Sequence, residues 1–185
     1  MDERIDIVDR HGNPTGKTAL KSDAHKYGWY HNTIHLWLYT KKGDILLQQR
    51  SHKKTIHPLL WDVSVAGHID AGETFEEALI RETQEEIGLK LSVTDLQKIG
   101  THLHETVYKN GAIKDFEFHQ VYISELKQDI QQLTPQADEV EALKLVKFKE
   151  FEELLANSKT NLHFIASNND YYIFVLNTIK NVLQQ

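Results

Sequence analysis

The sequence contains no cysteine, and this absence excludes several kinds of protein at once. A disulfide framework, a cysteine-ligated zinc site and a thiolate nucleophile all need that residue. Only 3 prolines and 9 glycines occur in 185 residues, which excludes collagen-like and low-complexity chains. No apolar run approaches the ~18 residues of a transmembrane helix, and the first residues lack the pattern of a secretion signal. We therefore expect a soluble, cytoplasmic protein with no membrane partner.

The composition that remains is typical of an ordinary globular domain. Apolar residues make up 40% and charged residues 26% of the chain, and the mean hydropathy is −0.49. A chain of 185 residues can bury a substantial core, and no repeat or proline-rich linker divides it. We therefore expect a single domain over residues 1–185.

The net charge of −6 arises in one segment of the chain. Residues 70–86 contain seven acidic residues and one base, Arg81, whereas elsewhere 20 bases balance 20 acids. Because this pattern predicts no basic surface, we do not expect a nucleic-acid polymer as a partner. A local concentration of carboxylates attracts cations instead, so we expect the chemistry of the protein to lie in this segment.

Hydrophobic patterning predicts strands and helices within one unit. Apolar runs bounded by turn residues predict strands at 5–8, 33–39, 45–48, 63–65, 98–104, 116–123 and 142–148. Helical periodicity covers 74–87, ending at Gly88, and returns at 151–156 and 171–183. The polar stretch 128–138 is predicted to be a surface loop. This mixture favours an α/β or α+β sandwich.

The predicted acidic helix places three carboxylates on one side. Glu82, Glu85 and Glu86 follow an i, i+3, i+4 spacing, so they lie within about one helical turn. The neighbouring side is apolar and should be buried, and the carboxylates beside it repel one another unless solvent or a cation neutralises them. Oxygen ligands of this kind favour Mg²⁺ or Mn²⁺. A solvated acidic face is the alternative interpretation.

Residues 67–89 read GHIDAGETFEEALIRETQEEIGL, and this segment resembles the Nudix box. That pattern is Gly, five residues, Glu, seven residues, Arg-Glu, an apolar residue, any residue, Glu-Glu, any residue, Gly and an apolar residue. The positions that match it are Gly67, Glu73, Arg81, Glu82, Glu85, Glu86, Gly88 and Leu89. Thr83 departs from the pattern, which has an apolar residue there. Its methyl group can pack, and its hydroxyl can bond backwards within the helix.

The resemblance implies a Nudix α/β/α sandwich, with a mixed β-sheet between helices, and a metal-dependent hydrolase. In the family, the residue at the position of Gly67 supplies a carbonyl ligand. Glu82, Glu85 and Glu86 are the implied Mg²⁺ or Mn²⁺ ligands and therefore the candidate catalytic residues.

The resemblance also implies a substrate and a reaction. We expect a small-molecule diphosphate, such as a nucleoside diphosphate derivative or a related organic diphosphate. Metal-activated water would attack one phosphorus, with Glu85 or Glu86 as the base. Glu73 and Arg81 are implied to form an ion pair that holds the loop before the acidic helix against that helix. An ordinary surface ion pair is the alternative.

Over most of its length the chain also resembles the type I isopentenyl-diphosphate isomerases. The resemblance lies in HLWLYTKKGDILLQQRS, in residues 61–68 and in AIKDFEFHQVYI. Those enzymes bind a second metal through three histidines and two acids, matched here by His25, His31, His68, Asp115 and Glu117. Asp115 stands where those enzymes have a glutamate. It lies two residues before Glu117 on a predicted strand, so both side chains face the same side. Such ligands suit Zn²⁺, Mn²⁺ or Fe²⁺, and ordinary hydrogen-bonded histidines are the alternative.

One position separates this chain from those isomerases. Arg50 and Lys54 match residues that hold the diphosphate, although solvated surface charge would explain them equally well. However, Ala66 stands where the isomerases have their catalytic cysteine, and no other thiol can replace it. The resemblance therefore favours a hydrolase over an isomerase or a non-catalytic nucleotide-sensing module. The physiological substrate and the oligomeric state stay open, a homodimer being one option.

Overall fold

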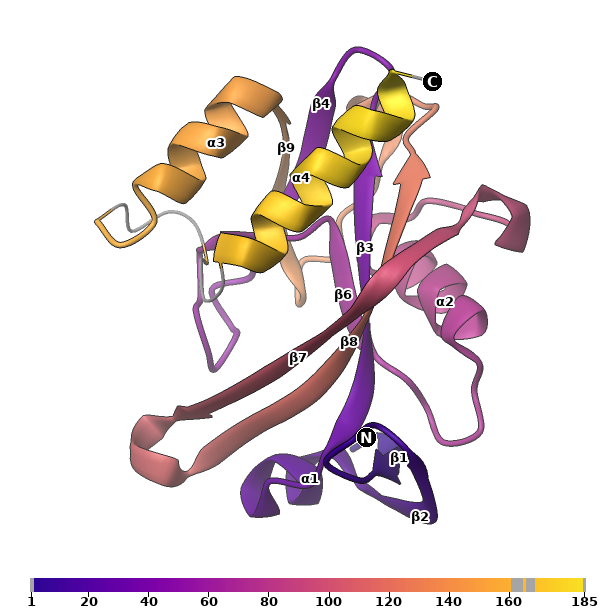
Figure 1. The fold of residues 1–185 in the computed structure, drawn as a ribbon, viewed down its shortest axis with the longest axis vertical. Helices are drawn as coiled ribbons and strands as arrows, with labels where there is room; N and C mark the ends of the chain where they lie inside the picture. The colour runs from indigo at the N-terminus through magenta and orange to yellow at the C-terminus, as the bar shows by residue number, and fades with distance from the viewer. Residues whose placement is uncertain (1, 161–164, 166–168, 185) are drawn as a thin grey trace.

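The computed structural model describes residues 2–160, 165 and 169–184 of the protein. In these residues, the strands form one mixed sheet with helices on both of its faces (Figure 1). The strands are β1 (Arg4–Val8), β2 (Pro14–Leu20), β3 (His31–Tyr39), β4 (Asp44–Arg50), β5 (Trp61–Asp62), β6 (Val65–His68), β7 (Gln97–Tyr108), β8 (Ile113–Glu125) and β9 (Val140–Lys147). The helices are α1 (Lys21–Tyr27), α2 (Phe75–Ile87), α3 (Phe148–Ala156) and α4 (Asn169–Leu183). This arrangement confirms the predicted α+β sandwich.

Strand β3 forms the centre of the sheet. β8 pairs with it in parallel along its whole length, from His31 opposite Glu117 to Tyr39 opposite Glu125. β1, β6 and β4 follow one another along β3 as antiparallel partners. β8 also pairs with β7 in a long antiparallel hairpin that projects from the body of the molecule (Figure 1). The strands β7, β8, β3 and β6 are therefore neighbours, in that order, and the candidate site lies on them.

Alternation along β3 divides the core into two layers. Ile34, Leu36 and Leu38 belong to a buried cluster with α2, whereas Trp37 and Tyr39 belong to a cluster with α3 and α4. Because both faces of β3 are covered, its side chains are almost all buried. None of the described helices is both long and apolar enough to cross a membrane.

Helix α2 begins and ends where the sequence predicts. The Thr74 hydroxyl accepts a hydrogen bond from the Glu77 amide, and the Glu77 carboxylate accepts one from the Thr74 amide in return. Gly88 ends the helix in the left-handed conformation at φ 70°, which glycine adopts without strain. Thr83 is fully buried, but its hydroxyl has no hydrogen-bond partner among the described residues. The backward bond expected of that hydroxyl is therefore not formed.

The structure differs from the sequence prediction mainly before the acidic helix. The sequence does not predict β2 and α1, because β2 is almost wholly exposed and Ala24 is the buried residue of α1. The strand predicted at 63–65 is two short strands, β5 and β6. Ser64 lies between them, and its hydroxyl accepts from the Leu38 amide and donates to the Leu46 carbonyl. A buried polar residue with partners on two other strands accounts for the interruption.

Candidate functional site

A cavity of about 800 Å³ lies where α2, the loop after β4 and α4 meet the strands β3, β6, β7 and β8. This volume is within the range of small-molecule sites. The cavity collects most of the residues that the sequence singled out, from Arg50 and Lys54 to the carboxylates of α2. Three of them, His31, Glu73 and Arg81, do not line it directly. Segments far apart in the chain therefore converge on one site.

The three carboxylates of α2 have different surroundings. Glu86 is 5% exposed, and its Oε2 atom accepts from the Ala66 amide at 3.4 Å and the Gln48 side-chain amide at 3.3 Å. The side chain of Glu85 is 59% exposed. Glu82 is mostly buried and lies against Gly67, where an added Cβ would overlap the Glu82 carboxyl group. Glycine at position 67 therefore creates the space that Glu82 occupies.

Burial raises the pKa of two of these carboxyl groups. Desolvation, with a contribution from the Glu82 charge, raises the pKa of Glu86 to about 8. Desolvation raises the pKa of Glu82 to about 7, although the adjacent Arg81 guanidinium opposes the rise. Two buried carboxyls that resist ionisation are what a divalent cation would stabilise in the charged form. The donor set therefore fits a hard cation such as Mg²⁺ or Mn²⁺.

Arg81 connects β6, α2 and the loop between them, residues 69–74. Its guanidinium donates twice to Glu73, at 2.9 and 2.8 Å, and once to the His68 carbonyl at 3.0 Å. It also donates to Glu82 at 2.9 Å. The structure thus brings Glu73 and Arg81 together in a two-pronged pair, a geometry more specific than that of an ordinary surface ion pair.

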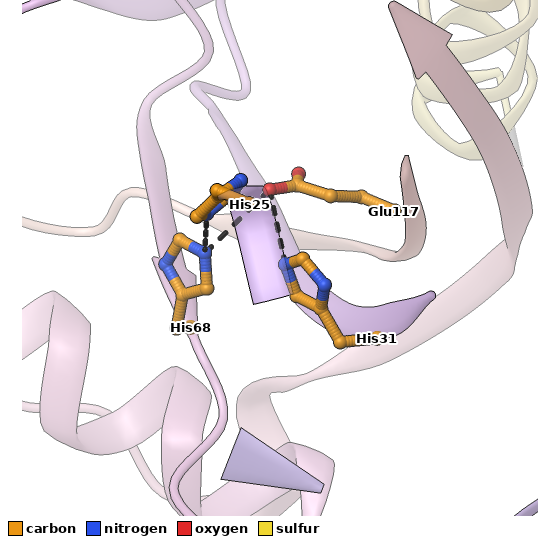
Figure 2. Close-up of side chains that lie close together, drawn as sticks. All are labelled: His25, His31, His68 and Glu117. Atoms are coloured by element: carbon orange, nitrogen blue, oxygen red, sulfur yellow. Dashed lines mark hydrogen bonds and ion pairs between the residues drawn. The ribbon is translucent and has the colours of Figure 1, made fainter. Parts of the chain in front are cut away.

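Four side chains from four elements form a second cluster (Figure 2). His25 comes from α1, His31 from β3, His68 from β6 and Glu117 from β8, and their ligand atoms lie within 4.8 Å of one another. The Nε2 atoms of His25 and His68 are 3.2 Å apart. The Nε2 atom of His31 lies 3.4 Å from Glu117 Oε1, and it is buried without a hydrogen-bond partner among the described residues. Converging imidazole nitrogens and one carboxylate fit Zn²⁺ or Mn²⁺.

Asp115, the fifth predicted ligand, lies beside this cluster and not within it. Its Oδ1 atom is 3.1 Å from Nδ1 of His25, whereas Nε2 of His25 faces His68. Its Oδ2 atom is 3.7 Å from Nε2 of His104. A carboxylate on the other ring nitrogen of a ligating histidine typically fixes the orientation and tautomer of that ring.

The two cations predicted to hold the diphosphate already have partners. Lys54 forms an ion pair with Glu139, and the Arg50 guanidinium donates to the Ile56 carbonyl at 3.2 Å and lies 3.7 Å from Asp62. Glu139 also lines the cavity, although the predicted surface loop ends just before it. Both cations therefore lie at the cavity, within reach of an anionic ligand.

Sequence reasoning missed a group of histidines on the sheet. His35, His102, His104 and His119 all line the cavity. On β7, the alternation of His102 and His104 with exposed Leu103 and Glu105 is a strand signal that could have identified two of them. Placing His35 and His119 in this group requires the register between the strands.

Comparison with known proteins agrees with this fold. Residues 29–167 match the model of the NUDIX domain. The chain is 35% identical over 158 residues to Nudix hydrolase 3 of Arabidopsis thaliana, covering 84% of this chain but 20% of that protein. It is 33% identical over 159 residues to isopentenyl-diphosphate Delta-isomerase 2 of Photorhabdus laumondii, covering 85% of each. The fold resembles a crystal structure from Deinococcus radiodurans, with TM-score 0.68, 21% identity and coverage of 92% of this chain and 97% of that one.

Proposed function

Because the chain belongs to the Nudix hydrolase family, we propose that it cleaves the diphosphate linkage of a small organic molecule with Mg²⁺ or Mn²⁺ as cofactor. A nucleoside diphosphate derivative is one substrate of this class. The observation that supports the proposal most directly is the pair of buried carboxyls, Glu82 and Glu86, held beside exposed Glu85 at the cavity. Ala66, which also lines the cavity, has no proton to exchange and supports hydrolysis over isomerisation.

The residues that would hold the ion are Glu82, Glu85, Glu86 and the Gly67 carbonyl. A bound divalent ion polarises a phosphoryl oxygen and offsets the negative charge of the transition state. Glu85 is the most exposed of the three carboxylates, so it can reach a water molecule in the cavity and accept its proton. Arg50 and Lys54 would orient the diphosphate by exchanging part of their contacts with Asp62 and Glu139 for phosphate oxygens.

A second ion is proposed for the cluster of His25, His31, His68 and Glu117. Its support is the unpartnered Nε2 of buried His31, together with the 3.2 Å approach of two other imidazole nitrogens. Metal analysis of the purified protein should find a Zn²⁺- or Mn²⁺-type ion that His25→Ala loses. Retention of the same metal content by His25→Ala would contradict this site.

The test of the hydrolase proposal is a panel of diphosphates incubated with Mg²⁺ or Mn²⁺. Nucleoside diphosphates, dinucleoside polyphosphates, nucleotide sugars and isoprenoid diphosphates would be compared, and ³¹P NMR would identify the products. Glu85→Gln should lower kcat on the best substrate about 100-fold or more, in line with the loss of a general base. Glu153→Gln, an exposed carboxylate on α3, is the matched control and should leave kcat unchanged.

Two results would contradict the proposal. The first is wild-type protein that releases no phosphate-containing product from any member of the panel. The second is undiminished turnover by Glu85→Gln. Product that is a rearranged isoprenoid diphosphate, with no phosphate released, would indicate an isomerase instead.

A further inference from the structure

Histidines on three adjacent strands form one wall of the cavity. β7 contributes His102 and His104, β8 contributes His119 and β3 contributes His35. The register explains the arrangement, because His102 lies opposite His119, which in turn lies opposite Thr33, two residues before His35. The rings of His35 and His119 stack with centroids 3.9 Å apart, and those of His104 and His119 are 5.4 Å apart. We call these four residues the histidine wall.

Buried partners fix the orientation of two of these rings. The Nδ1 atom of His35 lies 2.8 Å from the Tyr171 hydroxyl, which also accepts a hydrogen bond from Trp37 Nε1 at 2.8 Å. The Nδ1 atom of His119 lies 2.7 Å from the Thr33 hydroxyl. Each ring therefore uses Nδ1 to contact the scaffold. Among the described residues, no protein group forms a hydrogen bond with Nε2 of His35 or His119, so these atoms are available to a ligand in the cavity.

His35 can offer a hydrogen bond but not a charge. Burial lowers the pKa of His35 to about 3, so the imidazole is neutral under physiological conditions. A neutral ring does not attract a phosphate group as a cation does, but it can donate or accept one hydrogen bond through Nε2. The His35 ring therefore suits the uncharged part of a substrate, whereas Arg50 and Lys54 suit the diphosphate.

The part of the cavity lining that the structure describes offers little surface to a hydrocarbon chain. Among its described lining residues, the aliphatic ones are Ile56, Ala66 and Ile165. A hydrocarbon laid on the histidine wall would cover Nε2 atoms without pairing them. Sites built to hydrogen-bond a substrate can reject an analogue that lacks the polar group by roughly 10⁴-fold or more. The perpendicular rings of His57 and Tyr108, 5.4 Å apart, add aromatic surface for a planar group.

We propose that the histidine wall is the specificity surface of this site. It takes a diphosphate whose organic group carries hydrogen-bonding ring atoms or hydroxyls, as a nucleoside does, and it rejects an isoprenoid chain. This inference rests on the proposed function, since it assigns the substrate class of the same cavity. His35 is the residue that should matter most, because its ring is stacked, neutral and held through Nδ1.

The experiment measures binding, so that its outcome does not depend on turnover. Isothermal titration calorimetry would compare ADP with isopentenyl diphosphate, which both carry a terminal diphosphate, on the full-length protein loaded with Ca²⁺. Wild type should bind ADP at least tenfold more tightly. His35→Phe, which keeps a planar ring but removes both nitrogens, should weaken ADP binding about tenfold or more and change isopentenyl diphosphate binding less than twofold.

Two further variants keep the experiment decisive. His35→Gln retains a hydrogen-bonding side chain and should recover part of the ADP affinity, and it replaces His35→Phe if that protein does not fold. His52→Phe is the matched control, because His52 is an exposed histidine that pairs with Glu141 outside the cavity lining. Its affinity for both ligands should equal that of wild type.

The proposal is overturned if isopentenyl diphosphate binds as tightly as ADP, or if His35→Phe weakens both ligands equally. Measuring cleavage with Mg²⁺ in place of Ca²⁺ distinguishes a failure of this inference from a failure of the proposed function. ADP preference without cleavage of any member of the diphosphate panel would refute hydrolysis and support the wall. Cleavage of isopentenyl diphosphate at least as efficient as that of ADP would support hydrolysis and refute the wall.

Discussion

Glu86 is a carboxylic acid that the fold keeps away from water. Its carboxyl group accepts from two neutral donors, the Gln48 side chain and the Ala66 amide, and neither balances a full negative charge. Burial of that charge raises the pKa of Glu86 to about 8, with Glu82 adding repulsion. Without a cation, the folded protein therefore retains a proton here that the unfolded chain releases.

This retained proton should appear in the pH dependence of stability. Between about pH 4.5 and pH 8 the folded state binds a proton at Glu86 that the unfolded state has lost, so rising pH destabilises the fold by up to about 1.4 kcal/mol per pH unit. Glu86→Gln lacks this effect. In EDTA, its free energy of unfolding relative to wild type should therefore increase from pH 5 to pH 8 in urea titrations.

The histidines of the site are present in both proteins, so their contribution to stability cancels in the difference. Glu85→Gln is the matched control, because it removes the neighbouring carboxyl group that is exposed and leaves the buried one in place. A pH-independent difference for Glu86→Gln would contradict the buried, protonated carboxyl.

Gly67 is the second residue whose role follows from local geometry. A methyl group at this position would overlap the Glu82 carboxyl, so Gly67→Ala should displace Glu82 from the cavity edge. We expect a loss of kcat of about 100-fold or more. Mg²⁺ should also bind more weakly, so that half-maximal activity requires a higher Mg²⁺ concentration. Gly100→Ala is the control, since an added Cβ there has ordinary contact with Phe174. Full activity of Gly67→Ala would show that Glu82 does not need its present position.

At the scale of elements, α2 depends on its capping box. The Thr74 hydroxyl and the Glu77 carboxylate satisfy each other's backbone amides at the first turn. Thr74→Ala should lower the free energy of unfolding by about 1 kcal/mol, whereas Thr74→Ser should retain most of it. Chemical denaturation with far-UV circular dichroism measures both. Equal stability of the two variants would mean that the cap does not stabilise α2.

The sequence predicts α2 well because all of its determinants are local. Thr74, Glu77 and Gly88 mark its ends, and the spacing of its apolar residues marks its buried side. β2 and α1 lack such signals, since they are polar and mostly exposed and take their positions from pairing with β1 and packing against β8. The division between β5 and β6 arises from Ser64, whose partners lie on β3 and β4.

At the scale of the whole molecule, Tyr171 joins α4 to the sheet. Its buried hydroxyl contacts Trp37 and His35, both on β3. Tyr171→Phe removes that hydroxyl and leaves the buried Trp37 Nε1 without this acceptor, which should destabilise the protein by about 1 to 3 kcal/mol. Tyr27→Phe, at an exposed tyrosine, should change stability by less than about 0.5 kcal/mol. Thermal and urea unfolding of both variants check the expectation.

The site was predictable to the extent that it lies in one continuous segment. The box from Gly67 to Leu89 can be read directly, because its proposed metal ligands lie on β6 and α2, within one short stretch of the chain. The histidine wall could not be read in this way, since His35 and His102 lie 67 residues apart in the chain and come together through the pairing of β3 and β7 with β8. Likewise, the place of Asp115 beside His25 depends on which ring nitrogen faces inward, and no sequence pattern reports that.

Strand β6 contributes to both candidate metal positions and so affects how they bind ions. Within four residues it presents the His68 ring to one candidate position, while its Ala66 amide donates to Glu86 and its Gly67 lies against Glu82 at the other position. Because both positions are built on the same short strand, a shift of that strand on binding one ion changes the geometry of the other position. We expect the two ions to affect each other's affinity, seen as a metal titration that independent sites do not fit.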